Sequence, residues 1–354
     1  MPLSETDEEL LRQTYASVEL DFSTGQDPID DILRGIIGIF ERVFPGRISA
    51  YYLAGSYGEG TAVATSDIDF HPLFEDSFVS PDERALARQM GWLCDLLSPL
   101  DIAVVPQNAG APQGYGGLFK YKCRRVYGRA LDQQWTTPPF ANYLAGAMRN
   151  DEQRVARDQE LLLWPVDYPK PDDEFYGYIH GNVFSLDGYR GPGTKTLINY
   201  LYGMLIPLVS QQTQEYVIRK SDAFQLYQEH IDDKWAPFVG EVWESCRVQW
   251  QYRLPQTAPE RARLRALCRQ TRAFENHFLA VSSAFWLDRL RAWTANGQGN
   301  IATVLDYLGT VALPDGQAAA ALKDFHSADE RVVQRAARTR QKLERARREN
   351  PDAC

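Results

Sequence analysis

Two aspartates separated by one residue, Asp67 and Asp69, follow a turn that begins at Gly55-Ser56. In an extended strand the side chains at positions i and i+2 point to the same face, so we expect the two carboxylates to lie side by side. Two like charges that close need a cation between them. Mg²⁺ is suited to the pair, because it binds oxygen ligands and shares carboxylates with the phosphates of a substrate. The doublet therefore predicts a metal-dependent site that handles phosphate groups.

The glycine-serine turn supplies the other half of this arrangement. It follows a short apolar stretch, residues 50–54, that is typical of a buried strand. Gly55, Gly58 and Gly60 allow the backbone to approach a ligand closely and to adopt positive φ. Backbone amides and the Ser56 hydroxyl can then hold a triphosphate.

A third acid comes later in the chain, at Asp101. It is the one charged residue in the apolar stretch 100–105, which predicts a third strand beside the first two. A carboxylate at that position would complete a two-metal site.

The turn, the doublet and the third acid, in this order, resemble the pattern of the DNA polymerase β-like nucleotidyltransferase superfamily over about residues 30–130. An isolated Asp-x-Asp is more often a solvated strand end, and an isolated glycine turn is usually only a turn, but the ordered combination favours the site. The resemblance implies that Gly55 and Ser56 bind the phosphates of ATP. It also implies that Asp67, Asp69 and Asp101 hold two Mg²⁺ ions, with Asp101 as a possible general base.

Length and composition are those of a globular protein with two domains. The chain has 354 residues, more than one compact core usually holds, and its 44% apolar and 24% charged content argues against disorder. No apolar stretch is long enough to span a membrane, and the acidic amino terminus is unlike a secretory signal, which predicts a cytoplasmic protein. The five scattered cysteines and five isolated histidines predict neither a disulfide framework nor a zinc site.

The net charge of −9 bears on the second substrate. Proteins that bind a nucleic-acid backbone tend to carry a basic surface, whereas a negative field attracts cationic small molecules. The charge therefore favours a small cationic acceptor such as an aminoglycoside, although a local basic patch can be hidden in an acidic total.

The predicted fold class is α+β: a small mixed sheet with flanking helices, followed by a helical domain. Apolar periodicity predicts a helix over 28–44, and proline and acidic residues at its start predict a second helix over 81–97. Residues 118–127 resemble a further strand. Prolines between 138 and 171 predict a junction. We expect a nucleotidyltransferase domain at 1–135, a connecting segment at 136–175 and a helical domain at 176–354, with helices over 196–210, 221–230, 236–252, 259–290 and 329–348.

This architecture resembles the aminoglycoside nucleotidyltransferases, antibiotic-modifying enzymes whose helical domain forms one wall of the acceptor cleft and supplies a basic residue to the triphosphate. By that resemblance Lys220 binds the triphosphate, with Lys195 as the competing candidate. Glu174 and Glu215 are alternatives to Asp101 as the base.

Three classes of function stay open. The first is transfer of AMP from ATP to a hydroxyl of a small acceptor, by a mechanism in which metal ions assist attack on the α-phosphate. The second is modification of a protein or a tRNA end, as in antitoxin-like members of the superfamily. The third is a domain that has lost catalysis and only binds, against which the three intact acids argue.

Overall fold

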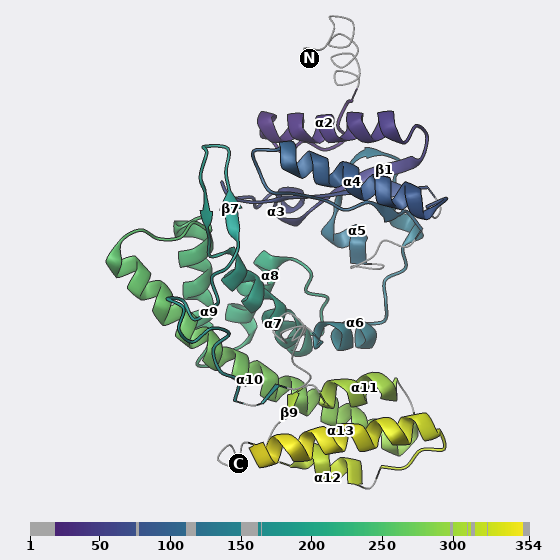
Figure 1. Ribbon diagram of the computed structural model, residues 1–354, viewed down its shortest axis with the longest axis vertical. Helices are drawn as coiled ribbons and strands as arrows, with labels where there is room; N and C mark the ends of the chain where they lie inside the picture. The colour runs from purple at the N-terminus through teal and green to yellow at the C-terminus, as the bar shows by residue number, and fades with distance from the viewer. Residues whose placement is uncertain are drawn as a thin grey trace, which may run out of the picture.

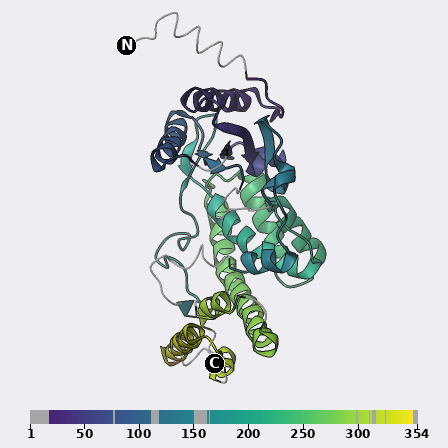
Figure 2. The same ribbon diagram turned by 90° about the vertical axis from the view of Figure 1, so that its right-hand side faces the viewer.

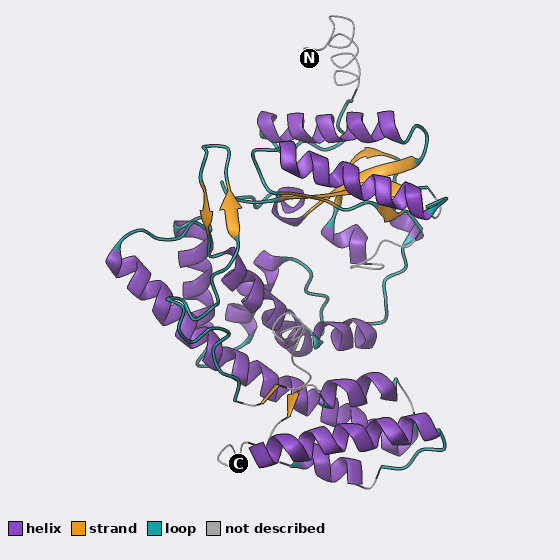
Figure 3. Cartoon of the chain, viewed as in Figure 1, coloured by secondary structure: helices purple, strands orange, loops and turns teal. Residues whose placement is uncertain are grey.

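A computed structural model describes residues 18–75, 78–110, 118–149, 162–163, 165–297, 300–309, 311–312, 316–323 and 325–349 of the chain. The fold is α+β, as expected, with a small mixed sheet at one end of the molecule and helices over the rest (Figures 1 and 3). Within these residues no helix combines the length and the apolar character needed to cross a membrane.

The sheet is built from strands of two to seven residues in the order β3-β2-β1-β5, with β4 also paired to β2. β2 runs antiparallel to β1 and parallel to β3 and β4, and β1 is antiparallel to β5. The strands are β1 (Ile48–Ala54), β2 (Ile68–Phe74), β3 (Ile102–Val104), β4 (Gln107–Asn108) and β5 (Arg124–Gly128).

One face of the sheet packs against two long helices. These helices, α2 (Asp27–Val43) and α4 (Pro81–Leu97), share a core with the strand residues Leu53, Ile68 and Phe70. Both have proline and acidic residues in the first turn, and the Ser80 hydroxyl accepts a hydrogen bond from the backbone N–H of Glu83 in α4.

The opposite face has a smaller aromatic core around Tyr52, Phe119 and Trp135. Phe119 lies in a short helix, α5 (Phe119–Lys122), where a strand over 118–127 was expected; the strand begins only at Arg124. Alternation of aromatic and basic residues in this stretch is typical of a strand. Instead, the backbone N–H of Cys123 donates to the Phe119 carbonyl and closes a single helical turn, which places the Phe119 ring against Tyr52. Tertiary packing therefore overrides the local pattern.

The rest of the molecule shares one continuous core formed by helices. Helix α10 is 39 residues long and runs alongside the others toward the carboxy-terminal end (Figure 2). The helices are α6 (Phe140–Ala147), α7 (Lys195–Thr213), α8 (Lys220–His230), α9 (Ala236–Val242), α10 (Ala258–Asn296), α11 (Ile301–Leu308), α12 (Gln317–Lys323) and α13 (Glu330–Glu349), with a π-helical turn at Trp243–Gln249 and a 3₁₀ turn at Asp132–Gln134.

Two small strand pairs accompany these helices. They are the hairpin of β7 (Asn182–Phe184) and β8 (Arg190–Pro192), and the pair of β6 (Leu162–Leu163) with β9 (Val311–Ala312). The helix expected over 236–252 is interrupted: α9 gives way to the π-helical turn, and Gln251 and Tyr252 then adopt positive φ. The domain boundaries expected from the sequence stay a prediction.

Candidate active site

The two carboxylates of the doublet, on Asp67 and Asp69, line a cavity of about 300 Å³ at the end of the central strands. Asp67 immediately precedes β2 and Asp69 is its second residue, so the alternation of the strand directs both side chains to one face while Ile68 enters the core. The arrangement predicted from their spacing is present in the structure.

The glycine-serine turn packs directly against this pair. Gly55 has φ +62°, and a Cβ atom built on it would lie 2.5 Å from Oδ2 of Asp69. Only glycine fits there, both for its backbone conformation and for the space. Gly55 opens the short helix α3 (Gly55–Glu59), and Ser56, in its first turn, lines the same cavity.

Three cationic side chains from the helical part lie across the cavity from the turn. Lys195, the first residue of α7, forms an ion pair with Asp67. Lys220, the first residue of α8, donates a hydrogen bond of 2.7 Å to Oδ1 of Asn199. Arg247 is buried and donates to the Thr61 carbonyl at 2.5 Å. Carboxylates and cationic side chains therefore line the same cavity.

Burial shapes the ionisation of these groups. It raises the pKa of Asp69 to about 6, and the neighbouring Asp67 carboxylate adds to the rise. Burial also lowers the pKa of Lys220 to about 8, against the attraction of Asp67. Each group is less stable as an ion than it would be in water, and a ligand that supplies the opposite charge would offset this cost.

The third acid, Asp101, lies next to the doublet along the sheet. Ile102 pairs with Ile68 in the parallel ladder, and the backbone N–H of Ile68 donates to the Asp101 carbonyl at 3.0 Å. Burial raises the pKa of the Asp101 carboxyl; the charge of Lys195 opposes the rise and that of Asp67 adds to it. Asp101 is not one of the residues that line the cavity.

No group of three or more His, Cys, Asp or Glu side chains is arranged to hold a metal ion in the part of the chain that the structure describes. The two doublet carboxylates nevertheless fit Mg²⁺, since this ion is commonly held by one or two carboxylates together with substrate phosphates. A bound cation would offset the repulsion between the two carboxylates, which contributes to the raised pKa of Asp69.

The alternative bases proposed from the sequence lie elsewhere. Glu174 is exposed and forms ion pairs with Arg261 and Arg265. Glu215 is exposed on the segment between α7 and α8. Neither side chain lines the cavity.

Several residues of the site carry no signal in the sequence. Arg247 and Tyr252 come from a π-helical turn and the reversal that follows it, and Asn199 projects from α7 beside Lys220. Lys122 ends α5. Each is polar or aromatic in a segment with no recognisable motif, and only the fold brings them together.

No protein-family model and no curated protein matches this sequence. Among solved structures, the spectinomycin adenyltransferase AAD(9) from Enterococcus faecialis, solved with ATP and spectinomycin, matches with a TM-score of 0.39 and 13% identity. The match covers 68% of this chain and 99% of that chain. A similarity this low carries no argument, so function has to be inferred from the site.

Proposed function

We propose that the protein is a nucleotidyltransferase that moves AMP from ATP to a hydroxyl group of an acceptor. One observation carries the proposal: a single cavity joins the Asp67 and Asp69 carboxylates, the Gly55-Ser56 turn and three cations of the helical part. Adjacent carboxylates suit a divalent ion, and the cations suit the phosphates that the ion accompanies.

The chain's own groups account for holding the triphosphate. Lys195, Lys220 and Arg247 provide positive charge on the side of the helices, and the Ser56 hydroxyl provides a donor on the side of the sheet. Arg247 is fixed by its bond to the Thr61 carbonyl and by a second bond to the Tyr252 hydroxyl. A guanidinium that is already fixed loses little entropy when it binds phosphate oxygens.

Asp67 and Asp69 would hold Mg²⁺, with Asp101 as the proposed third ligand. When bound, the ions lower the pKa of the attacking hydroxyl and stabilise the charge that develops on the phosphate oxygens. The Gly55 turn keeps Asp69 in place, because its bare Cα leaves the space that the carboxylate occupies.

In the transfer step the acceptor oxygen forms a bond to the α-phosphorus and the bond from that phosphorus to the β-phosphate oxygen breaks. Pyrophosphate leaves with the electron pair, and its charge is offset by the lysines at the starts of α7 and α8. The hydroxyl proton passes to a carboxylate, and Asp101 is the general base predicted from the sequence. The net charge of −9 favours a small cationic acceptor such as an aminoglycoside.

The test is incubation with ATP labelled at its α-phosphate, Mg²⁺ and a panel of aminoglycosides, tRNA and cell extract. The proposal predicts label on a small acceptor, and it predicts that this label is lost in the Asp67→Asn variant. The control is Asp82→Asn, which should keep the label because Asp82 is an exposed carboxylate at the start of α4. Label on tRNA or on a protein would redirect it to a macromolecular acceptor. Failure to bind ATP would refute it.

A further inference from the structure

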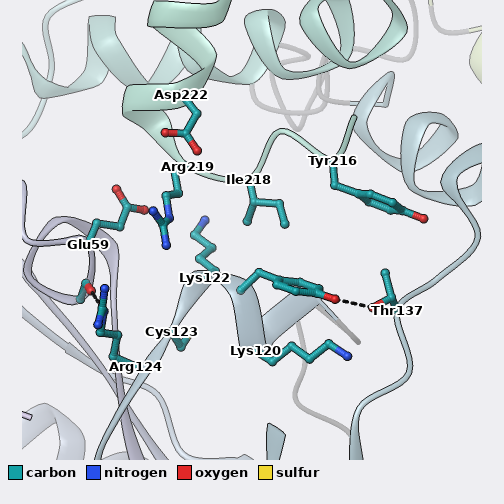
Figure 4. Close-up of a pocket in the computed structure, with 12 residues that line it drawn as sticks. Glu59, Lys120, Lys122, Cys123, Arg124, Thr137, Tyr216, Ile218, Arg219 and Asp222 are labelled. Carbon is teal, nitrogen blue, oxygen red and sulfur yellow. Dashed lines mark hydrogen bonds between the residues drawn. The ribbon is translucent and has the colours of Figure 1, made fainter. Parts of the chain in front are cut away.

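A second cavity, of about 660 Å³, lies beside the first and shares two lining residues with it. Figure 4 shows this second cavity. Its floor comes from α5 and the start of β5, and its opposite wall from residues 216–222, which lead into α8. Its volume is within the range typical of small-molecule sites. The proposed function leaves it without a role.

The lining of this cavity is basic, in contrast to the protein as a whole. Four cationic side chains reach it, those of Lys120, Lys122, Arg124 and Arg219. Two carboxylates oppose them, on Glu59 and Asp222. A protein whose net charge is −9 therefore places an excess of positive charge at this position.

Two of these cations are held in place by carbonyl oxygens. Lys120 donates to the carbonyl of Trp135 at 2.9 Å, and Nε of Arg124 donates to the carbonyl of Gly58 at 2.9 Å. Carbonyl partners fix a side chain but do not cancel its charge. Lys120 and Arg124 form no ion pair with any residue that the structure describes, whereas Arg219 lies beside the Glu59 carboxylate.

The two cavities meet at Glu59 and Lys122, which line both. Figure 4 shows the Glu59 carboxylate beside Arg219 and Lys122 at one end of the second cavity. A molecule in the second cavity would therefore present its near end to the phosphates held in the first. Tyr216, at the far end in Figure 4, offers a ring for packing.

We propose that the second cavity is the acceptor subsite and that it binds an anionic acceptor, a small hydroxyl-bearing molecule that carries a phosphate or carboxylate group. This inference rests on the proposed function and replaces the cationic acceptor suggested by the net charge. Charge at the cavity acts on a bound molecule at a few ångströms, whereas distant surface charges are screened beyond about 10 Å.

The donor does not account for this cavity. The phosphates of ATP are matched by the cations of the first cavity, and the nucleoside that remains is uncharged. A nucleoside placed here would make no use of the positive charge of the lining.

Because Glu59 lines both cavities, it lies where the acceptor hydroxyl would meet the α-phosphate. It accepts the hydroxyl proton as the oxygen forms its bond to phosphorus and pyrophosphate departs with the electrons of the broken bond. Burial raises the pKa of Glu59, while Lys122, Arg219 and Lys220 oppose the rise. In this arrangement Glu59, and not Asp101, is the base.

The first experiment uses acceptors matched in skeleton but not in charge, with ATP labelled at the α-phosphate and Mg²⁺. The panel is glucose-6-phosphate, glucose and glucosamine, together with glycerol-3-phosphate, glycerol, gluconate and kanamycin. We expect label on anionic members only, and binding that weakens as salt is raised. Equal or better transfer to neutral or cationic members, or no binding by any anionic member, would overturn the inference.

The second experiment measures the binding of the acceptor and of ATP to Arg219→Gln and to Lys220→Gln, with two further variants as controls. Arg219→Gln should weaken the binding of the best anionic acceptor about tenfold, the loss of one charge-assisted hydrogen bond, and change ATP binding less than twofold. Arg219→Lys should recover most of the loss, and Arg42→Gln, on the exposed end of α2, should have no effect. Lys220→Gln should do the reverse, weakening ATP and sparing the acceptor.

These measurements separate the two ideas. If ATP is transferred to a cationic acceptor whatever residue stands at 219, the proposed function survives and the anionic subsite is refuted. If anions bind in a manner that depends on Arg219 but ATP does not bind, the proposed function fails and the acceptor role fails with it.

The role of Glu59 as the base is tested by Glu59→Gln. We expect kcat to fall with the KM for ATP unchanged and the acidic limb of the pH profile to disappear. A retained limb would exclude Glu59 as the base.

Discussion

The sheet and the helical part contribute opposite charges to the candidate active site. The sheet supplies carboxylates from the short stretch between Gly55 and Asp69, with Asp101 just before β3. The helical part supplies cations from three separate places, at Lys195, Lys220 and Arg247. A turn and a strand fix positions one or two residues apart in sequence, whereas the cations depend on how distant helices pack. The first kind of site is visible in a sequence. Of the cations, Lys195 and Lys220 were suggested only by a family resemblance, and Arg247 was not predicted.

The two parts also hold their charges by different means. Asp69 is half-buried and packs against the Gly55 turn, with its pKa raised to about 6, so its position is set by packing. Arg247 is set by hydrogen bonds that cross from the helical part to Thr61. The variants below test each side separately.

The largest effect is expected from Asp69→Asn, on the sheet side. A neutral amide of the same shape cannot hold a divalent ion beside the phosphates, so turnover should fall about a thousandfold or more. The fold should remain, because the substitution removes a buried charge without changing its volume. Transfer rate and the thermal melting temperature measure the two effects. Activity within tenfold of the wild type would exclude Asp69 as a metal ligand.

The next effect is expected from Gly55→Ala, compared with Gly60→Ala. Both glycines have positive φ, so alanine strains each backbone by about 1 kcal/mol. A Cβ at position 55 would also lie 2.5 Å from Oδ2 of Asp69, whereas nothing lies within 4 Å of one at position 60. We expect Gly55→Ala to lose about a hundredfold in kcat and Gly60→Ala to lose little, because a small displacement of a catalytic group costs about that much. Equal losses would show that strain alone decides.

The sequence predicts the sheet side well for a physical reason. The i and i+2 carboxylates, the glycine turn and the buried strand are local features, and the structure has all of them where they were expected. Helices α2, α4, α7 and α8 were likewise expected, to within a few residues, because their apolar periodicity or their capping residues are local as well.

Features that depend on tertiary structure were not predicted. Residues 119–122 form a helix, because the Phe119 ring has to reach the core below Tyr52. The cation Arg247 lies in a π-helical turn that no pattern marks. The basic second cavity is formed by α5, β5 and the loop before α8, so the net charge of the chain gave no indication of it.

A smaller effect on the helical side concerns Lys220 and pH. Burial lowers the pKa of this lysine to about 8, so above that pH the free protein carries it uncharged. A triphosphate prefers the protonated form, and binding at higher pH therefore requires uptake of a proton. ATP affinity, measured without metal, should fall up to about tenfold per pH unit above 8. In Lys220→Arg the side chain stays charged and the fall should be absent; an identical decline would show that another group is responsible.

The smallest effect is expected where the two parts of the site are joined. Thr65 is buried just before the doublet, and its hydroxyl donates to the carbonyl of Gln251. Gln251 has φ +46°, an unfavourable conformation for a residue other than glycine, and its carbonyl is held by this bond. Thr65→Val keeps the shape and removes the donor, so it should cost about 1 kcal/mol and lower the melting temperature by a few degrees.

The same variant also tests whether this junction matters to the site. Tyr252, which follows Gln251, accepts from Arg247 and lines the cavity with the doublet, so loss of the Thr65 bond should raise the KM for ATP a few fold. Thr294→Val is the matched control, because the Thr294 hydroxyl bonds to Leu290 within its own helix. If both variants melt alike and bind ATP alike, the carboxylates and the cations are held independently, and the packing of the helices alone brings them together.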